Sequence, residues 1–200
     1  MIYPKVLLEL IEYFKKFPGI GDKSAERMAL ALLDINSDDV NSFANAMLEA
    51  KNKLHPCNIC GCLTDSDVCM ICSNEFRRDN LICILEDFKG VFAFEKTGKY
   101  NGKYHVLNGL ISPIDDIGPE DINIASLIDR IKDKESVEVI IALKPSIEGE
   151  TTTLYIKEIL SKYSNVKVSR LSYGIPMGVD IDYLDELTLL NALNERKNLS

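Results

Sequence analysis

The stretch CNICGCLTDSDVCMIC, residues 57–72, decides how the rest of the chain is interpreted. It holds two Cys-x2-Cys pairs separated by eight residues, at Cys57, Cys60, Cys69 and Cys72. Two tight turns at this spacing offer four thiolates to one tetrahedral zinc ion and leave no coordination position open. We therefore predict a structural zinc site with one Zn²⁺ per chain.

Neighbouring residues leave alternatives for this motif. Cys62, between the two pairs, and His55, just before them, are alternative ligands, although neither belongs to a Cys-x2-Cys pair. The four cysteines could also be reduced core thiols, but the segment has almost no hydrophobic periodicity from which a core would form. Cys83 lies in a continuous apolar run and is predicted to be an ordinary core residue.

The overall composition is that of a soluble globular chain. It has 200 residues, of which 46% are hydrophobic and 27% charged. It shows no signal-peptide pattern and no apolar stretch of the roughly 18 residues that a transmembrane helix needs, so we expect a cytoplasmic protein with no membrane partner. Its net charge of −8 repels polyanions, so any nucleic-acid binding requires a local patch.

Residues 1–55 are predicted to form a small helical module. Apolar residues recur at helical spacing in three runs, 6–16, 24–33 and 40–48. We expect Ser37 or Asp38 to be the N-cap of the third helix. Residues 1–54 contain 7 basic and 8 acidic residues, against 16 and 23 in the remainder, so the acidity is concentrated outside this module.

The turn FPGIGDKSA, residues 17–25, joins the first two of these helices. Both Gly19 and Gly21 can adopt positive φ and bring backbone N–H groups close to a bound phosphate. The pattern resembles the helix-hairpin-helix motif, which binds a DNA backbone without reading bases, and Lys23 and Arg27 would then lie beside that phosphate. A plain helix stop followed by a turn explains the same glycines, because short motifs give false positives.

The pattern changes after residue 78 to alternating strands and helices. Apolar or β-prone runs occupy 81–85, 137–143 and 166–171, and helical patterns occupy 122–132 and 151–162. Such continuous apolar runs are typical of parallel strands that are covered on both faces. The chain is therefore predicted to be multidomain α+β, with a helical module at 1–55, a zinc finger at 56–78, an α/β domain with a parallel sheet at 79–172 and a short helical tail at 173–200.

The sequences around Glu86 and Lys144 resemble the Toprim domain of topoisomerases, primases and recombination proteins. In catalytic members, a glutamate after one strand and an Asp-x-Asp pair after another hold Mg²⁺ for phosphoryl chemistry. Lys144 and Ser146 occupy the two aspartate positions here, so an ammonium group lies where the metal would bind. Glu86, Glu148 and Glu150 remain. We predict an interaction surface, although the last two are equally explained as first-turn helix residues.

Nucleophilic and ATP-driven chemistry have little support. The chain has two histidines, His55 and His105, and neither is next to a serine or cysteine in a recognisable nucleophile setting. His105, in the run 104–107, is expected to be a strand residue with a hydrogen-bond partner. No Gly-x4-Gly-Lys-Ser/Thr loop is present.

The order of these modules resembles that of the RecR family of bacterial recombination mediators. Segments similar to the family's signatures are FPGIGDKSAERMA at 17–29, VCMICS at 68–73, NGLISPID at 108–115, IGPED at 117–121 and YGIPMG at 173–178. The resemblance covers nearly the whole chain. Two departures are Lys144, where many relatives have Asn, and Val179, where many have a second glycine.

The resemblance implies a non-enzymatic DNA-repair factor. Family members form rings, commonly tetramers, that encircle DNA and act with RecO and RecF to help RecA load at single-stranded gaps. Several weak phosphate sites in one ring would gain the avidity that an acidic monomer lacks. The residues carried over are the zinc ligands Cys57, Cys60, Cys69 and Cys72, the DNA contacts Gly19, Gly21, Lys23 and Arg27, and the partner-binding residues Glu86, Lys144, Glu148 and Glu150.

Two other functions stay open at this point. A Toprim-type, Mg²⁺-dependent nuclease or primase-like enzyme would lose its activity in Glu86→Gln, but its Asp-x-Asp pair is absent. A zinc-stapled adaptor without a DNA role would use Gly19 and Gly21 as a simple turn. In that case, replacing Lys23 and Arg27 by alanine would leave any DNA affinity unchanged.

Overall fold

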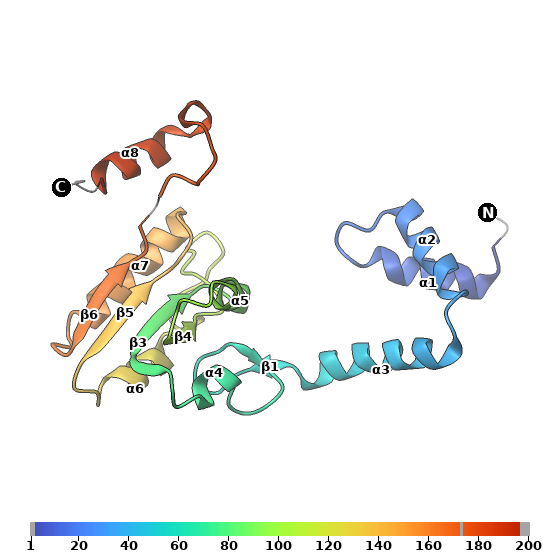
Figure 1. The fold of residues 1–200 in the computed structure, drawn as a ribbon, viewed down its shortest axis with the longest axis horizontal. Coiled ribbons are helices and arrows are strands. Elements are labelled where there is room, and N and C mark those ends of the chain that lie inside the picture. Colours follow the sequence, from blue (N-terminus) through green and yellow to red (C-terminus); the bar gives the residue numbers. More distant parts are fainter. Residues whose placement is uncertain (1–2, 173, 197–200) are drawn as a thin grey trace. The chain divides into compact units, whose positions relative to one another are not determined.

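Residues 3–172 and 174–196 are described by a computed structural model, in which the chain divides into two units, Met1–Leu54 and His55–Ser200. The first unit contains α1 (Lys5–Lys15), α2 (Asp22–Leu32) and α3 (Ser37–Lys53) (Figure 1). The second contains a parallel sheet with its covering helices and, before the sheet, the cysteine-rich segment, residues 55–73. Tyr173 and residues 197–200 of the predicted tail lie outside the described residues.

Helices α1 and α2 form because their apolar residues share one face, and they pack on each other through a small core. Ile11 and Phe14 of α1 are buried with Ala25 and Ala29 of α2. Alanine side chains at the contact let the two helix backbones approach closely. The helix predicted over 6–16 is confirmed within one residue at each end.

Helix α3 has a different N-cap from the one predicted. Asn36 takes this position instead of Ser37 or Asp38, because its backbone is extended and its side-chain oxygen accepts the Asp39 N–H at 2.8 Å. The helix has no buried residue in its described length, although Phe43 and Met47 are large and apolar. Its apolar stripe is therefore left without a full packing partner within this unit.

The sheet of the second unit is parallel, as predicted, with strand order β4-β3-β5-β6. Its strands are β3 (Arg78–Leu85), β4 (Gly102–Val106), β5 (Val137–Ile141) and β6 (Val166–Arg170). The helices are α5 (Phe88–Lys96), α6 (Ala125–Ile131) and α7 (Ile147–Leu160). Helix α5 was not predicted, and α7 begins four residues before the predicted run because Ser146 caps it by accepting the Gly149 N–H.

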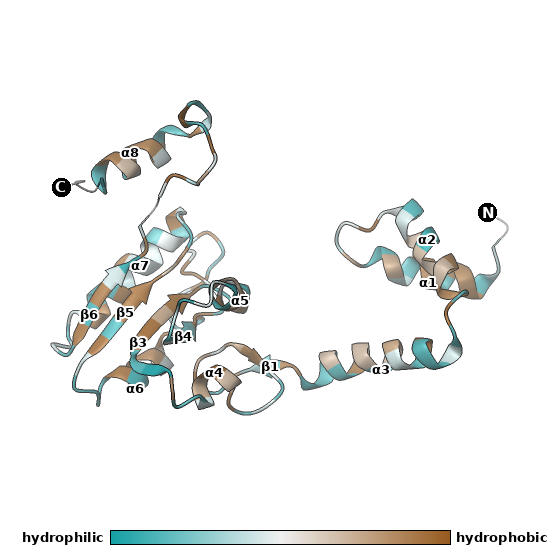
Figure 2. Ribbon diagram, viewed as in Figure 1, coloured by the Kyte–Doolittle hydropathy of each residue, from teal (hydrophilic) through white to brown (hydrophobic). Residues whose placement is uncertain are grey.

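Both faces of the sheet are covered, which explains the continuous apolar runs. On β3, Ile82 and Ile84 belong to a core shared with α6 and α7. Cys83 and Leu85 point into a second core that includes Val91 of α5 and the buried cysteines of the cysteine-rich segment. Figure 2 shows the resulting hydrophobic colouring of β3 and β5. Cys83 is a core residue, as predicted, and burial raises the pKa of its thiol to about 12.

Shorter elements precede and follow the sheet. The cysteine-rich segment contains the antiparallel pair β1 (His55–Pro56) and β2 (Leu63–Thr64) and the short helix α4 (Met70–Ser73). After β6 come the 3₁₀ helix η1 (Ile181–Tyr183) and α8 (Glu186–Asn194). The predicted helical tail is thus helical in these two stretches, and Leu184 lies between them. None of the described helices combines the length and apolar character needed to cross a membrane.

His105 is a fully buried strand residue with hydrogen-bond partners, as expected. It lies in β4, where its Nε2 is bonded to the carbonyl oxygen of Asn123 and its Nδ1 lies 3.2 Å from Nη1 of Arg130. The guanidinium can only donate, so the imidazole is neutral, with Nδ1 accepting and Nε2 donating. Burial lowers the pKa of His105 to about 4.

We expect the protein to lose stability in mild acid because of His105. The pKa in the folded state lies below the unfolded value near 6.5, so the stabilisation is complete above pH 6.5 and is lost as the pH falls toward 4. The full difference between the two pKa values corresponds to a loss of about 3 kcal/mol in the free energy of unfolding. Proton NMR of the imidazoles, with His105→Gln to assign the signal, checks this. A His105 signal with a midpoint above pH 6 would contradict it.

Candidate metal centre and nucleic-acid interface

The four cysteines of the two Cys-x2-Cys pairs come together in one cluster. The Sγ atoms of Cys57, Cys60, Cys69 and Cys72 all lie within 4.8 Å of one another, and those of Cys60 and Cys69 are 3.6 Å apart. Four sulfurs around a zinc ion with bonds of about 2.3 Å lie about 3.8 Å from each other. The donor set and its size therefore fit a tetrahedral Zn²⁺.

Backbone N–H groups point at the sulfurs. Cys57 Sγ accepts from the N–H groups of Ile59 and Cys69 at 3.4 and 3.3 Å, and Cys69 Sγ accepts from that of Cys72 at 3.4 Å. Such donors stabilise thiolates, the form that binds metal. Cys62 is buried but lies outside the cluster, and His55 Nδ1 instead lies 3.1 Å from the carbonyl oxygen of Pro56.

The cysteine-rich segment packs against the sheet, which the sequence did not indicate. We expected almost no core here, yet Cys57, Cys60 and Cys69 are each at most 3% exposed and belong to the core beside β3. The carbonyl oxygen of Cys60 also accepts the Val106 N–H, at the end of β4, at 2.7 Å. The segment therefore covers the β4 edge of the sheet.

The turn between α1 and α2 is open to a ligand, and only one of its two glycines uses the positive φ that both can adopt. Gly19 has φ +81°, as expected, but Gly21 is extended (φ −89°, ψ 177°) and is the N-cap of α2. A Cβ atom at either glycine would meet nothing within 4 Å. Among the described residues no side chain caps α2, so its first N–H groups are available to an anion.

Lys23 and Arg27 are both exposed and lie one turn apart on α2. Neither forms an ion pair or hydrogen bond within the described part of the chain. The nearby carboxylate of Asp22 is instead paired with Lys15 at 2.8 Å, which lowers the pKa of Asp22. The surface beside the turn therefore presents two unpaired cations, while the carboxylate of Asp22 is neutralised by Lys15.

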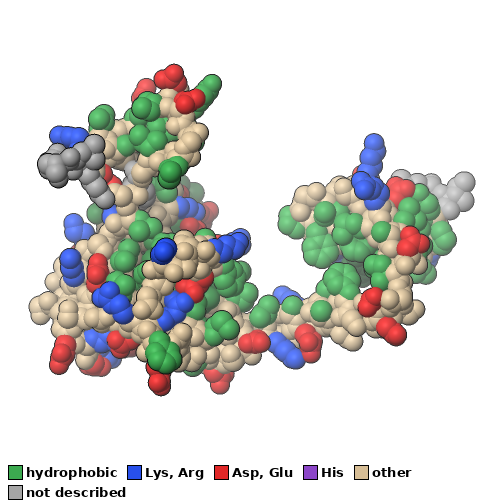
Figure 3. Space-filling view, in the orientation of Figure 1, with side chains coloured by type: hydrophobic (Ala, Val, Ile, Leu, Met, Phe, Trp, Pro, Cys, Tyr) green, Lys and Arg blue, Asp and Glu red, His purple; other side chains and the backbone are tan. Residues whose placement is uncertain are grey.

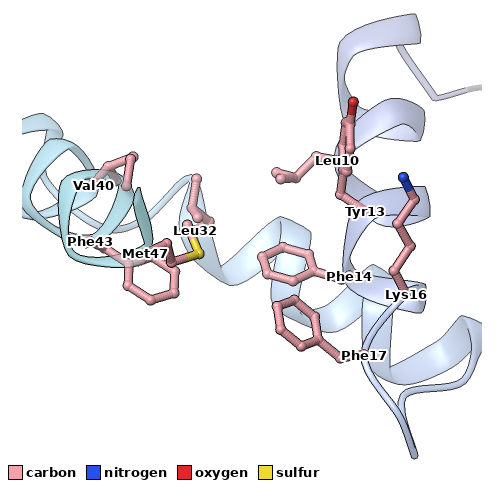
Figure 4. Close-up of a pocket in the computed structure, with 10 residues that line it drawn as sticks. Leu10, Tyr13, Phe14, Lys16, Phe17, Leu32, Val40, Phe43 and Met47 are labelled. Atoms are coloured by element: carbon pink, nitrogen blue, oxygen red, sulfur yellow. The ribbon is translucent and has the colours of Figure 1, made fainter. Parts of the chain in front are cut away.

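A large apolar groove lies in the same unit. Residues from α1, α2 and α3 line it, and Phe14 and Phe17 face Phe43 and Met47 across it (Figure 4). Phe17 and Phe43 are 53% and 51% exposed. Figure 3 shows the hydrophobic side chains gathered on this unit. An exposed apolar surface of this kind is typical of a protein interface.

Of the four residues of the predicted partner-binding face, Glu86 and Lys144 are brought together as an ion pair. Lys144 Nζ lies 3.1 Å from Glu86 Oε1, so the ammonium neutralises the glutamate that a catalytic Toprim domain would use for metal. Glu148 and Glu150 lie in the first turn of α7, as the alternative explanation held. Glu150 is also paired with Arg170 of β6 at 3.3 Å, a contact that sequence reasoning missed.

Sequence reasoning also missed Lys103 and Gly149. Lys103 lies in β4, is 8% exposed, and reaches carbonyl oxygens of the cysteine-rich segment. Gly149 lies in the first turn of α7, directly against the carbonyl of Lys144. Sequence analysis recognised only the run 104–107 as a strand, whereas β4 begins at Gly102. A lysine within a buried strand would have signalled the role of Lys103.

Comparison with known proteins gives matches along the whole chain. The Toprim domain family matches residues 80–172, the RecR helix-hairpin-helix family residues 7–51, the RecR four-cysteine zinc finger domain family residues 54–74 and the RecR C-terminal family residues 174–197. The recombination protein RecR of Staphylococcus haemolyticus (strain JCSC1435) is 47% identical over 199 residues, which cover 100% of both chains.

Proposed function

The chain belongs to the RecR family of recombination proteins, and we propose that it binds DNA as an oligomeric ring and, with RecO and RecF, helps RecA load at single-stranded gaps. In this proposal it acts in the cytoplasm, without catalysis of its own. The observation that carries the DNA role is the pair of unpaired cations, Lys23 and Arg27, beside an uncapped helix N-terminus.

The proposed DNA contact uses three groups of the turn. Gly19 and Gly21 leave space for the backbone to approach a phosphate, and the first N–H groups of α2 point outward as donors. Lys23 and Arg27 add two positive charges on the same helix. Contacts of this kind bind the DNA backbone and carry no base specificity, as a protein acting at any gap requires.

The apolar groove and the charge both support the proposed self-association. The stripe of α3 has no buried residue, and a second copy would cover it. A chain of net charge −8 binds DNA weakly by itself. In a ring, the turns at residues 17–25 of several protomers would bind one duplex together. The number of copies in the ring that we propose is four.

The Lys144–Glu86 pair favours an interaction surface over an enzyme. An ammonium group 3.1 Å from the glutamate neutralises the carboxylate that would bind Mg²⁺ in a catalytic Toprim domain. We propose that Glu86, Lys144, Glu148 and Glu150 contact RecO or RecF, and that one Zn²⁺ per chain, held by the four cysteines, has a structural role. Mg²⁺-dependent cleavage or synthesis that disappears in Glu86→Gln would favour the enzyme alternative.

We expect Lys23→Ala/Arg27→Ala to weaken DNA binding strongly. Each phosphate contact that is lost removes about 0.9 from the slope of log affinity against log salt concentration, so the loss of two contacts lowers the slope by about 2 for each protomer that touches the DNA. Binding to gapped DNA is measured across salt concentrations, with the mass in solution recorded alongside. The effect should be largest at low salt.

The matched control is Lys5→Ala/Lys51→Ala, which removes the same charge from exposed positions of the same unit. It should leave the salt slope close to that of the wild type. If the two double variants behave alike, the turn is not the DNA contact. If wild-type protein shows no binding at low salt, the chain is an adaptor whose DNA contact depends on other proteins.

A further inference from the structure

Lys103 is a nearly buried cation at the cysteine-rich segment. It is 8% exposed, and its Nζ donates to the carbonyl oxygens of Ile71, Cys72 and Asn74 at 3.2, 2.7 and 2.9 Å. These are carbonyls at the C-terminal end of α4, the helix that carries Cys72. All three protons of the ammonium are thus used, on the side where helix carbonyls concentrate negative charge.

Further charges line the small pocket beside Cys72. Its wall contains Cys72, Lys103, Arg130, Lys134 and Asp79. The carboxylate of Asp79 is ion-paired with Lys134, and Lys103 forms no ion pair in the part of the chain that the structure describes. Lys103 and Arg130 therefore contribute an excess of about two positive charges at the wall that Cys72 shares. A buried charge without a counter-charge is costly.

A zinc ion bound by the four cysteines would supply the missing negative charge. Four thiolates around one Zn²⁺ carry a net charge of about −2, which matches the excess of Lys103 and Arg130. Arg130 is held in place by donating to the Tyr104 carbonyl at 2.7 Å and to His105 Nδ1 at 3.2 Å. An external anion such as phosphate is disfavoured here, because it would be repelled by the zinc-thiolate charge.

We propose that Lys103 and Arg130 are the counter-cations of the zinc centre, so that zinc retention depends on charge supplied by β4 and α6. This inference rests on the proposed zinc occupancy and goes beyond it, because it assigns metal affinity to residues outside the four ligands. It also couples the metal to the sheet edge, because Lys103 of β4 loses its counter-charge when zinc leaves.

The test is a zinc competition titration of the full chain with a chromophoric chelator. Lys103→Gln keeps hydrogen-bond donors but removes the charge, and it should lower the zinc affinity about 10- to 100-fold. Lys103→Arg keeps the charge and should retain most of the affinity. Lys167→Gln, at an exposed position of β6 on the opposite edge, is the matched control and should bind zinc as the wild type does.

Wild-type affinity in Lys103→Gln would overturn the proposal, and so would an equal loss in Lys103→Gln and Lys103→Arg, which would assign the effect to packing. Zinc absent from the purified wild type would instead refute the occupancy itself. If Lys103→Gln does not fold, hydrogen exchange of the wild type before and after chelation tests the coupling between zinc and β4 instead. Protection lost at β4 but kept at β6 supports the coupling, and unchanged or equal protection at both overturns it.

Discussion

Cys60→Ser is expected to release zinc and unfold residues 57–72 while the core between the sheet, α6 and α7 persists. Cys60 is 1% exposed, its Sγ lies 3.6 Å from that of Cys69, and its carbonyl accepts the Val106 N–H. Structural zinc contributes about 10–16 kcal/mol in isolated zinc fingers, comparable to the whole stability of a typical domain. Zinc content, circular dichroism and limited proteolysis measure the loss.

Cys62→Ser is the control for this prediction. Cys62 is 2% exposed in the same segment, but its sulfur lies outside the four-sulfur cluster. The same change of sulfur to oxygen should therefore keep the zinc and reduce stability by a smaller amount. A strong chelator acting on the wild type should reproduce the proteolysis pattern of Cys60→Ser. Equal zinc loss in the two variants, or full zinc in Cys60→Ser, would refute the assignment of ligands.

The features that the sequence predicted correctly are those with strong local signals. The runs that became β3 and β5 are largely apolar because both sheet faces are covered there, and this burial is directly visible in composition. The run that became β6 alternates apolar and polar residues and has no buried residue, so only its β-prone pattern indicated a strand. The cysteine spacing is equally local, since each pair belongs to one tight turn. The comparisons confirm the family and the module types that these patterns predicted.

The features that sequence analysis missed depend on tertiary contacts. Helix α5 contains Gly90 and several aromatic residues, so its helical periodicity is weak until Val91 packs on β3. Lys103 looks like a solvent-exposed residue in sequence, because only the fold places it under α4. The extended conformation of Gly21 follows from its role as N-cap, which becomes clear only once the start of α2 at Asp22 is known.

Gly149→Ala is the second substitution for which we expect a large effect. A Cβ atom there would lie 2.0 Å from the carbonyl oxygen of Lys144, and this backbone is fixed because the same oxygen accepts the Ser146 N–H at 2.9 Å. The loop that carries Lys144 would have to move away from α7. We expect a loss of about 3 kcal/mol or more, together with displacement of Lys144 from Glu86.

Gly90→Ala provides an unusually close control, because Gly90 and Gly149 are both the third residue of a helix that follows a strand. Each donates its N–H to the capping side chain at 3.1 Å, to Asp87 and Ser146 respectively. A Cβ at Gly90 would lie 3.1 Å from Leu85 Cδ2, the end of a side chain that can rotate. Alanine is favoured over glycine in helices by about 1 kcal/mol, so Gly90→Ala should change stability little. Chemical denaturation of both variants separates helix propensity from the clash, and equal stability would show that the Lys144 loop yields without cost.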